Sequence, residues 1–251
     1  MSPPLSVIVI TKNEERNIAD CLESVRWADE IVLVDAESTD STVEIARKHN
    51  AKIFIRAWRG FSQAKQFALE QTTHRWILWI DADERVTPEL AEEIQKCVRA
   101  DREDIGGYRF ARRAYFLGRW IRHCGWYPGY VVRLFKKDTV RFTDDDVHEQ
   151  IEVPGRIETL HHDLLHFTDN SLEHYFNKYN SYTSLAANQM MESGKRVSIA
   201  DLLLRPGFIF LKMYLLKLGF LDGMRGFILC KLSASYVFTK YAKLWEAQQK
   251  K

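Results

Sequence analysis

The sequence has few cysteines and no long uncharged apolar segment. Its four cysteines, Cys21, Cys97, Cys124 and Cys230, are scattered along 251 residues with no C-x-x-C spacing. This pattern indicates neither a disulfide framework nor a zinc site, and it is typical of a reducing compartment. Because no run of about 18 uncharged apolar residues exists, we expect no membrane-spanning helix. The first residues also lack a basic region followed by an apolar stretch, which argues against a cleaved signal peptide.

The nearly balanced charge, +2 overall, conceals an asymmetry along the chain. Residues 195–251 contain eleven lysines and arginines but three acidic residues, a net charge of +8, so the remainder carries −6. Between Phe208 and Leu221 the lysines lie among aliphatic and aromatic residues. This pattern predicts a helix that lies on an anionic membrane surface. The alternative is a packed helix whose lysines extend to solvent. Basic residues among aliphatics argue against a nucleic-acid partner.

The first half of the chain alternates apolar strands with segments of helical spacing. We expect strands at residues 5–10, 30–34, 52–55 and 76–80, followed by further strands at 108–116 and 130–135. Such alternation predicts an α/β fold with a mostly parallel sheet flanked by helices. From residue 171 onward the pattern is helical, with a break expected at Arg205-Pro206-Gly207. We therefore divide the chain into a domain at 1–170 and a helical, basic and apolar extension at 171–251.

Two carboxylates follow the apolar strand at residues 76–80. Asp81 and Asp83 are two residues apart, so their side chains share one face at the strand's end. In open α/β sheets ligands bind at that edge. Carboxylate oxygens suit Mg²⁺ or Mn²⁺, and such an ion binds a diphosphate. A merely solvated acidic loop is the alternative, but Asp35 ends an earlier strand in the same way.

Four motifs in this order resemble family 2 glycosyltransferases with the GT-A fold: Ser6–Glu14, Val34–Asp40, Asp81-Ala82-Asp83 and His148-Glu149. Within that family the chain is most similar to bacterial lipopolysaccharide core glucosyltransferases. The resemblance covers residues 5 to about 170, and parts of the tail share it. It implies a GT-A (Rossmann-like) fold. It further implies an inverting, metal-dependent transfer of a hexose to a lipopolysaccharide inner-core or related glycan. The resemblance favours glucose from UDP-glucose, and UDP-galactose or another nucleotide sugar is the alternative donor.

The resemblance assigns the nucleotide-sugar site to residues at the ends of the first strands. These are Thr11, Asn13, Glu14, Asp35, Lys65, Asp81 and Ala82. Among them, Asp35 is expected to hydrogen-bond the base. The plain structural alternatives are a helix cap for Asn13, a turn residue for Asp35 and a solvated helix lysine for Lys65.

The resemblance also implies a metal site and a general base. Asp83 and Asp81 would hold Mn²⁺ or Mg²⁺, with His166 as a further ligand and His161 or His162 as substitutes. Glu149 would take the proton of the acceptor hydroxyl, with Asp146 in reserve. The alternative for this segment is an exposed acidic turn.

Acceptor recognition is expected between residues 115 and 135. Trp126 and Tyr127 offer faces that stack on sugar rings, and Arg133 could pair with phosphate or carboxylate groups. Packing against the sheet is the alternative for this cluster. A lipid-linked acceptor and the basic tail together imply a cytoplasmic, peripheral location on the inner face of the bacterial inner membrane.

Two other functions share some of these features. A nucleotidyltransferase also uses a carboxylate-bound metal on an α/β scaffold. It would normally place a glycine-rich, basic loop after the first strand, and Thr11–Glu15 does not provide one. A non-catalytic, membrane-associated module that binds nucleotide sugars is the second alternative, and it would not require Glu149.

Overall fold

The computed structural model describes residues 3–58, 60–142 and 151–250, and the chain divides into two compact units. Unit 1 comprises Met1–Arg112 and Tyr130–Phe167, and unit 2 comprises Arg113–Gly129 and Thr168–Lys251. The division after residue 167 lies close to the one expected at 170. The membership of residues 113–129 in unit 2 was not expected from the sequence.

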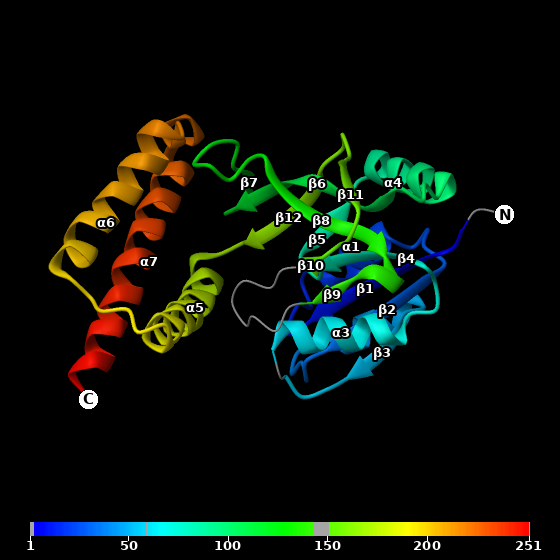
Figure 1. The fold of residues 1–251 in the computed structure, drawn as a ribbon, viewed down its shortest axis with the longest axis horizontal. Coiled ribbons are helices and arrows are strands. Elements are labelled where there is room, and N and C mark those ends of the chain that lie inside the picture. The colour runs from blue at the N-terminus through cyan, green and yellow to red at the C-terminus, as the bar shows by residue number, and fades with distance from the viewer. Residues whose placement is uncertain (1–2, 59, 143–150, 251) are drawn as a thin grey trace. The chain divides into compact units, whose positions relative to one another are not determined.

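Four parallel strands form the first half of the sheet in unit 1 (Figure 1). In the order in which they pair, they are β3 (Lys52–Ile55), β2 (Glu30–Asp35), β1 (Leu5–Thr11) and β4 (Trp76–Asp81). β1 and β2 are buried along their whole length, as their continuous apolar sequences predict for a sheet covered on both faces. The predicted α/β class and the parallel sheet of the first half are confirmed.

The sheet continues past β4 with strands of mixed direction. In order these are β8 (Gly129–Lys136), β6 (Ile105–Phe116), β12 (Leu164–Asp169) and β5 (Glu84–Val86). β8 is antiparallel to β4, and β12 is antiparallel to β5 with His166 opposite Glu84. The short strands β7 (Arg119–Trp120) and β11 (Arg156–Thr159) pair with β6, and β9 (Arg141–Phe142) pairs with β10 (Ile151–Glu152).

Helices cover both faces of the parallel strands. On one face lie α1 (Ile18–Ser24), α2 (Thr42–Ala46) and α4 (Pro88–Ala100), which pack on alternate strand residues such as Val9 and Leu33. On the other face α3 (Phe61–Gln71) packs on Ile8, Val32 and Trp79. Two 3₁₀ turns, η1 (Arg47–His49) and η2 (Lys137–Thr139), complete the unit.

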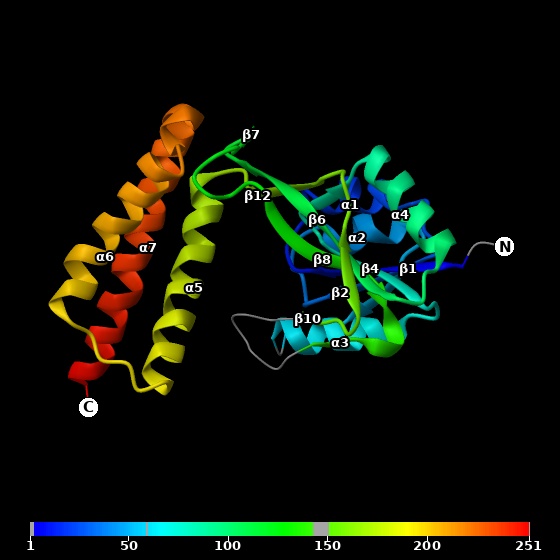
Figure 2. The same cartoon turned by 45° about the horizontal axis from the view of Figure 1, so that its top comes forward.

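Unit 2 contains three long helices. These are α5 (Leu172–Glu192), α6 (Ile199–Leu211) and α7 (Gly223–Gln249), and α7 lies between the other two (Figure 2). A π-helical turn, η3 (Lys212–Leu216), and a 3₁₀ turn, η4 (Gly219–Asp222), join α6 to α7. Residues of the 113–129 segment pack on α7 through a core that includes Phe116, Ile121 and Leu229. All four cysteines are free thiols.

The expected break at Arg205-Pro206-Gly207 is wrong, because α6 runs through it with Pro206 inside the helix. An interior proline removes one backbone hydrogen bond and costs about 3 kcal/mol. Packing of α6 side chains such as Phe210 against the core shared with α7 offsets that cost. The helix also has a capping box, Ser198 with Asp201, that fixes its first turn. Within residues 3–58, 60–142 and 151–250, no helix is long and apolar enough to cross a membrane.

Candidate active site

The carboxyl ends of β1, β2 and β4 bring a pocket and a carboxylate to one face of the sheet. Ile10 pairs in register with Val34 on β2 and with Asp81 on β4. Register partners in parallel strands point to the same face, so all three side chains lie on the face that α3 covers. Ile10 and Val34 line the pocket, and Asp81 ends the neighbouring strand.

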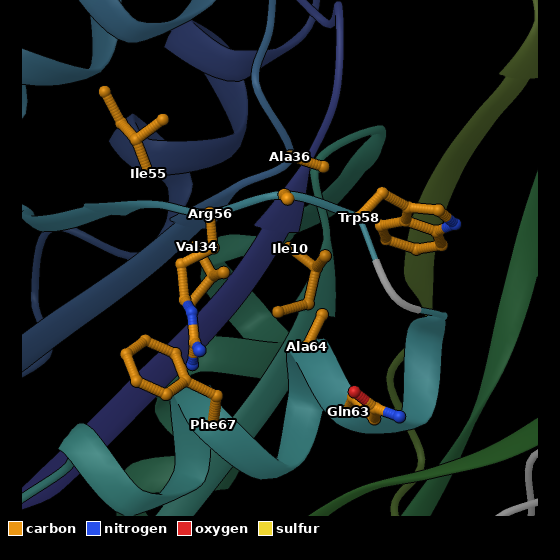
Figure 3. A pocket seen from close by; sticks show the side chains of 10 residues that line it. Ile10, Val34, Ala36, Ile55, Arg56, Trp58, Gln63, Ala64 and Phe67 are labelled. Carbon is orange, nitrogen blue, oxygen red and sulfur yellow. The ribbon is translucent and has the colours of Figure 1, made fainter.

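The pocket has a volume of about 230 Å³ and opens between the strand ends and α3. Its remaining walls are Ala36, Ile55, Arg56, Ala57, Trp58, Gln63, Ala64 and Phe67. The guanidinium of Arg56 lies 4.1 Å from the centre of the Phe67 ring, and Trp58 stands at the opposite end of the pocket (Figure 3). Flat aromatic and apolar walls with one cation suit a planar, partly anionic ligand.

The turn after β1 is tied to the turn after β2. The backbone amide of Asn13 donates to Ser38 Oγ, and the amide of Thr39 donates to Asn13 Oδ1, each over 2.8 Å. Glu14 donates its amide to Thr42 Oγ1, also over 2.8 Å. Asn13 is therefore not a helix cap, since α1 begins at Ile18 after Asn17. It takes a left-handed conformation (φ 54°) and braces two loops.

Asp35 and Thr11 lie at the same edge but on the opposite face of the sheet from the pocket. Both carboxylate oxygens of Asp35 accept from Ser38, one from its amide and one from its hydroxyl. Asp35 is fully buried and closes its own turn, which was the plain alternative for this residue. The Thr11 hydroxyl is buried without a hydrogen-bond partner.

Lys65 and Arg133 both contact the indole of Trp79. The Lys65 Nζ lies 3.9 Å and the Arg133 Cζ 3.8 Å from the ring centre. Both cations are buried, at 5 % and 3 % exposure. The solvated alternative for Lys65 is therefore wrong. Two desolvated cations beside Asp81 favour the ionised form of its carboxylate.

Arg133 connects Asp81, the first residue of the Asp81-Ala82-Asp83 motif, to Glu84, which follows the motif. Its Nη2 donates to Asp81 Oδ2 over 2.5 Å and to Glu84 Oε1 over 2.9 Å. Glu84 is wholly buried and accepts the backbone amide of Asp81 with its other oxygen. Trp79 Nε1 donates to the second oxygen of Asp81 over 3.2 Å. These contacts fix the orientation of the Asp81 carboxylate.

The same contacts set the charge of Asp81. Burial favours the neutral acid, but the positive charges of Arg133, Lys65 and His166 outweigh it and lower the pKa of Asp81 to about 2. Asp81 is consequently ionised at neutral pH. Arg133 is held protonated by the same two carboxylates, which raise its pKa above the ordinary value against the effect of burial.

Asp83 faces His166, which comes from β12. Asp83 Oδ2 and His166 Nε2 are 3.4 Å apart, and the Phe167 amide donates to the backbone oxygen of Asp83. Burial lowers the pKa of His166, but the carboxylates of Asp83 and Glu84 raise it further than burial lowers it. The other two candidate histidines lie elsewhere, since the amides of His161 and His162 both donate to Glu93 on α4.

A carboxylate and an imidazole this close could ligate one ion together. Within the described part of the chain, no group of three or more His, Cys, Asp or Glu side chains could hold a metal. A site with two protein ligands fits Mg²⁺ or Mn²⁺ when substrate phosphates complete the coordination. Asp83 and His166 thus suit a metal that arrives with a diphosphate.

The remaining predicted residues fall outside this cluster. Ala82 is buried within the motif. Glu149 and Asp146 lie outside the described residues. Trp126 and Tyr127 belong to unit 2, where Trp126 packs edge-on against Phe116 and Tyr127 against Trp120. Arg133, grouped with them from the sequence, instead lies in unit 1 beneath Asp81.

Sequence reasoning missed several residues of the site. Glu84 directly follows the Asp81-Ala82-Asp83 motif, and a third acidic residue there was a visible signal. Trp79 was read only as part of the strand. Arg56 and Trp58 follow β3 without a recognisable pattern, so the pocket wall they form depends on the fold.

Comparison with known proteins gives a consistent answer over most of the chain. The model of the family Glycosyl transferase family 2 matches residues 6–161. The lipopolysaccharide core biosynthesis glycosyltransferase LpsC of Rhizobium meliloti is 34 % identical over 97 % of this chain and 92 % of its own. An uncharacterized glycosyltransferase of Rickettsia typhi, RT0209, is 32 % identical over 98 % of this chain and 88 % of its own.

Solved structures resemble the chain more distantly. Residues 1–349 of Staphylococcus aureus TarS give a TM-score of 0.45 at 15 % identity, covering 98 % of this chain and 91 % of that one. Glucosyl-3-phosphoglycerate synthase of Mycobacterium tuberculosis, solved with Mn²⁺, UDP and phosphoglyceric acid, gives 0.40 at 22 % identity over 44 % of each chain. These scores are too low to extend the assignment. The family model and the curated relatives suffice: the chain belongs to glycosyl transferase family 2 and is a glycosyltransferase.

Proposed function

We propose that the chain transfers a hexose, glucose from UDP-glucose, with inversion to a lipopolysaccharide inner-core or related lipid-linked glycan. One observation carries the donor part of this proposal. The pocket and the Asp81 carboxylate share one face of the sheet at the carboxyl ends of its parallel strands. The acceptor part is supported by the 34 % identity to LpsC, a lipopolysaccharide core biosynthesis glycosyltransferase.

The donor would occupy the site in two parts. The base would enter the pocket between Trp58 and Phe67, with Arg56 close to its polar edge. The diphosphate would extend toward the end of β4, where Lys65 would offset part of its charge. Thr11, Asn13, Glu14 and Asp35 would shape the turns beside the base.

A divalent ion would be held by Asp83 and His166, with Asp81 beside it. When bound, Mn²⁺ or Mg²⁺ neutralises charge that develops on the departing nucleoside diphosphate. Arg133 keeps the Asp81 carboxylate ionised, and Arg133 and Trp79 together orient it for a hydroxyl of the donor. Glu149 would take the proton of the acceptor hydroxyl on the opposite face of the sugar.

Trp126 and Tyr127 are proposed to contact the acceptor. The enzyme would work at the inner face of the bacterial inner membrane, where a lipid-linked acceptor is available. This reading is favoured over a nucleotidyltransferase because the family assignment and the turn after β1 both disagree with that class.

A donor screen tests the proposal. Purified protein is incubated with UDP-glucose, UDP-galactose, UDP-GlcNAc or an ADP- or GDP-sugar, with Mn²⁺ or with EDTA, and with core lipooligosaccharide or without it. We expect nucleoside diphosphate release from UDP-glucose that requires the metal and rises with the acceptor. Asp83→Ala and Glu149→Gln should each lose at least about 100-fold in kcat. Release from none of the donors would contradict the proposal, and normal turnover by Glu149→Gln would contradict the assignment of the base.

A further inference from the structure

α6 and η3 present an exposed apolar face at the edge of the three-helix unit. Leu204, Phe208, Leu211 and Leu215 recur at intervals of four, three and four residues, so they line one side of the helix. Leu203 and Leu216 extend this stripe, and all six side chains are more than half exposed. We call these six residues the apolar ridge. Met224, at the start of α7, is 71 % exposed as well.

The inward face of α6 already has its partner within the unit. Phe210 and Met213 pack into the core formed by Cys124, Leu229 and Cys230. α7 is that partner and lies between α6 and α5 (Figures 1 and 2). The ridge is therefore a second apolar face of the same helix, and it is not the face that stabilises the unit. Exposed apolar surface of this extent marks an interaction site.

The charges around the ridge are almost entirely positive. Residues 195–231 contain seven lysines and arginines and two acidic residues, Asp201 and Asp222. Both acidic side chains are buried and already engaged. Asp201 caps α6 and pairs with Arg205, whereas Asp222 accepts from the amides of Arg122 and His123. Lys212 and Lys217, in and directly after η3, are both exposed.

We infer that the apolar ridge docks on an anionic lipid surface, with Leu204, Phe208, Leu211 and Leu215 in the acyl boundary and Lys212 and Lys217 at the headgroups. An aliphatic stripe bordered by lysines is the chemistry of an interfacial helix. α6 lies on the bilayer rather than across it, since no helix among the described residues is long and apolar enough to span one.

A second copy of the chain fits the ridge less well. A two-fold contact would place the same positive surface against itself, and the repulsion between like charges would oppose it. An anionic bilayer has the opposite charge and also accepts aliphatic side chains that make no hydrogen bonds. The inference deepens the membrane location in the proposed function, yet it depends only on residues outside the donor site.

Sedimentation with vesicles tests the inference without any glycan or sugar donor. The full chain is mixed with vesicles of phosphatidylcholine alone or of phosphatidylcholine with phosphatidylglycerol, at low and high salt. We expect binding to the anionic vesicles that weakens with salt. Leu204→Glu/Phe208→Glu should weaken binding by at least about tenfold. Lys212→Gln/Lys217→Gln should weaken it severalfold and reduce its salt dependence.

The control is Ile157→Glu/Leu185→Glu, which adds two carboxylates at exposed apolar positions outside the ridge, on β11 and α5. It should bind like the unchanged protein. Circular dichroism and thermal melting check that each variant is folded. Unchanged binding by a folded Leu204→Glu/Phe208→Glu variant would overturn the inference. A dimer in sedimentation velocity that this variant dissociates, without vesicle binding by either protein, would also overturn it and assign the ridge to a second copy.

Failure of the proposed function looks different. Vesicle binding with no turnover of any nucleotide sugar would leave the ridge assignment standing and remove the assigned donor chemistry. Turnover of a nucleotide sugar without vesicle binding would leave the donor chemistry standing and remove the ridge assignment.

Discussion

At the scale of single residues, Arg133 determines how the Asp81 carboxylate is presented. Its buried guanidinium packs over the Trp79 ring and bridges the carboxylates of Asp81 and Glu84. We expect Arg133→Met to destabilise the fold by about 3–5 kcal/mol, because the buried Glu84 would lose its closest cation and keep the longer, 3.5 Å pair with Arg112. Urea unfolding at pH 7 measures this loss. kcat/KM should also fall at least about tenfold, since Asp81 would lose its fixed orientation.

A double variant separates orientation from stability. Arg133→Met/Glu84→Gln removes both buried charges, so most of the lost unfolding free energy should return. Activity should stay low, because nothing then fixes the Asp81 carboxylate. If activity returned together with stability, Arg133 would have a structural role only.

Ala64 tests the pocket itself. It lies on α3 and lines the pocket, whereas Gln66 on the same helix is exposed and faces solvent. We expect Ala64→Phe to fill the pocket and to weaken UDP binding at least about tenfold, with little change in Tm. Gln66→Phe is the matched control and should bind UDP normally. Equal affinities of the two variants in calorimetry would place the base elsewhere.

At the scale of elements, Glu30 at the start of β2 ties three strands together. Its carboxylate accepts from Ser6 on β1, from Lys52 on β3 and from Thr73 before β4. Burial would raise its pKa, but these hydrogen bonds and the Lys52 charge lower it from 4.5 to about 2. Because the folded-state pKa is depressed, the stabilisation is complete above pH 4.5 and disappears as the pH falls toward 2.

We therefore expect Glu30→Gln to lose about 3 kcal/mol of unfolding free energy at pH 7, the value of a pKa difference of this size. The difference between the two proteins should shrink steadily below pH 4.5. Urea unfolding at several pH values measures it. Glu23→Gln, which removes an exposed partner of Arg26, is the control and should change little at any pH. A loss for Glu30→Gln that did not vary with pH would contradict the assignment.

The parallel elements could be predicted because their signals are local. β1, β2 and β4 are continuous apolar runs that end in polar residues, and Asp81 and Asp83 follow β4 directly. The sequence predicted a break within α6 because Pro206 is a local signal for the end of a helix. Its packing in unit 2 depends on distant residues, which no local pattern contains.

At the scale of the whole molecule, contacts between residues far apart in the chain could not be predicted from the sequence. Residues 113–129 belong with the C-terminal helices because the amides of Arg122 and His123 donate to Asp222, about 100 residues away. Arg133 was grouped with the acceptor residues because they are its neighbours in sequence. Its contact with Asp81 joins β8 to β4 and is not visible in the sequence. Residue types indicated candidate groups near Asp81, whereas the contacts among those groups depend on the fold.

The central claim is that the end of β4 and the adjacent pocket bind a nucleoside diphosphate together with a divalent ion. Calorimetric titration of UDP with Mn²⁺ or with EDTA tests it most directly, using the unchanged protein, Asp83→Asn and the control Asp104→Asn. Asp104 is an exposed carboxylate that pairs with Arg102. We predict that Mn²⁺ strengthens UDP binding at least about tenfold in the unchanged protein and in Asp104→Asn, and that Asp83→Asn loses this gain. An affinity for UDP that neither Mn²⁺ nor Asp83→Asn alters would contradict the account.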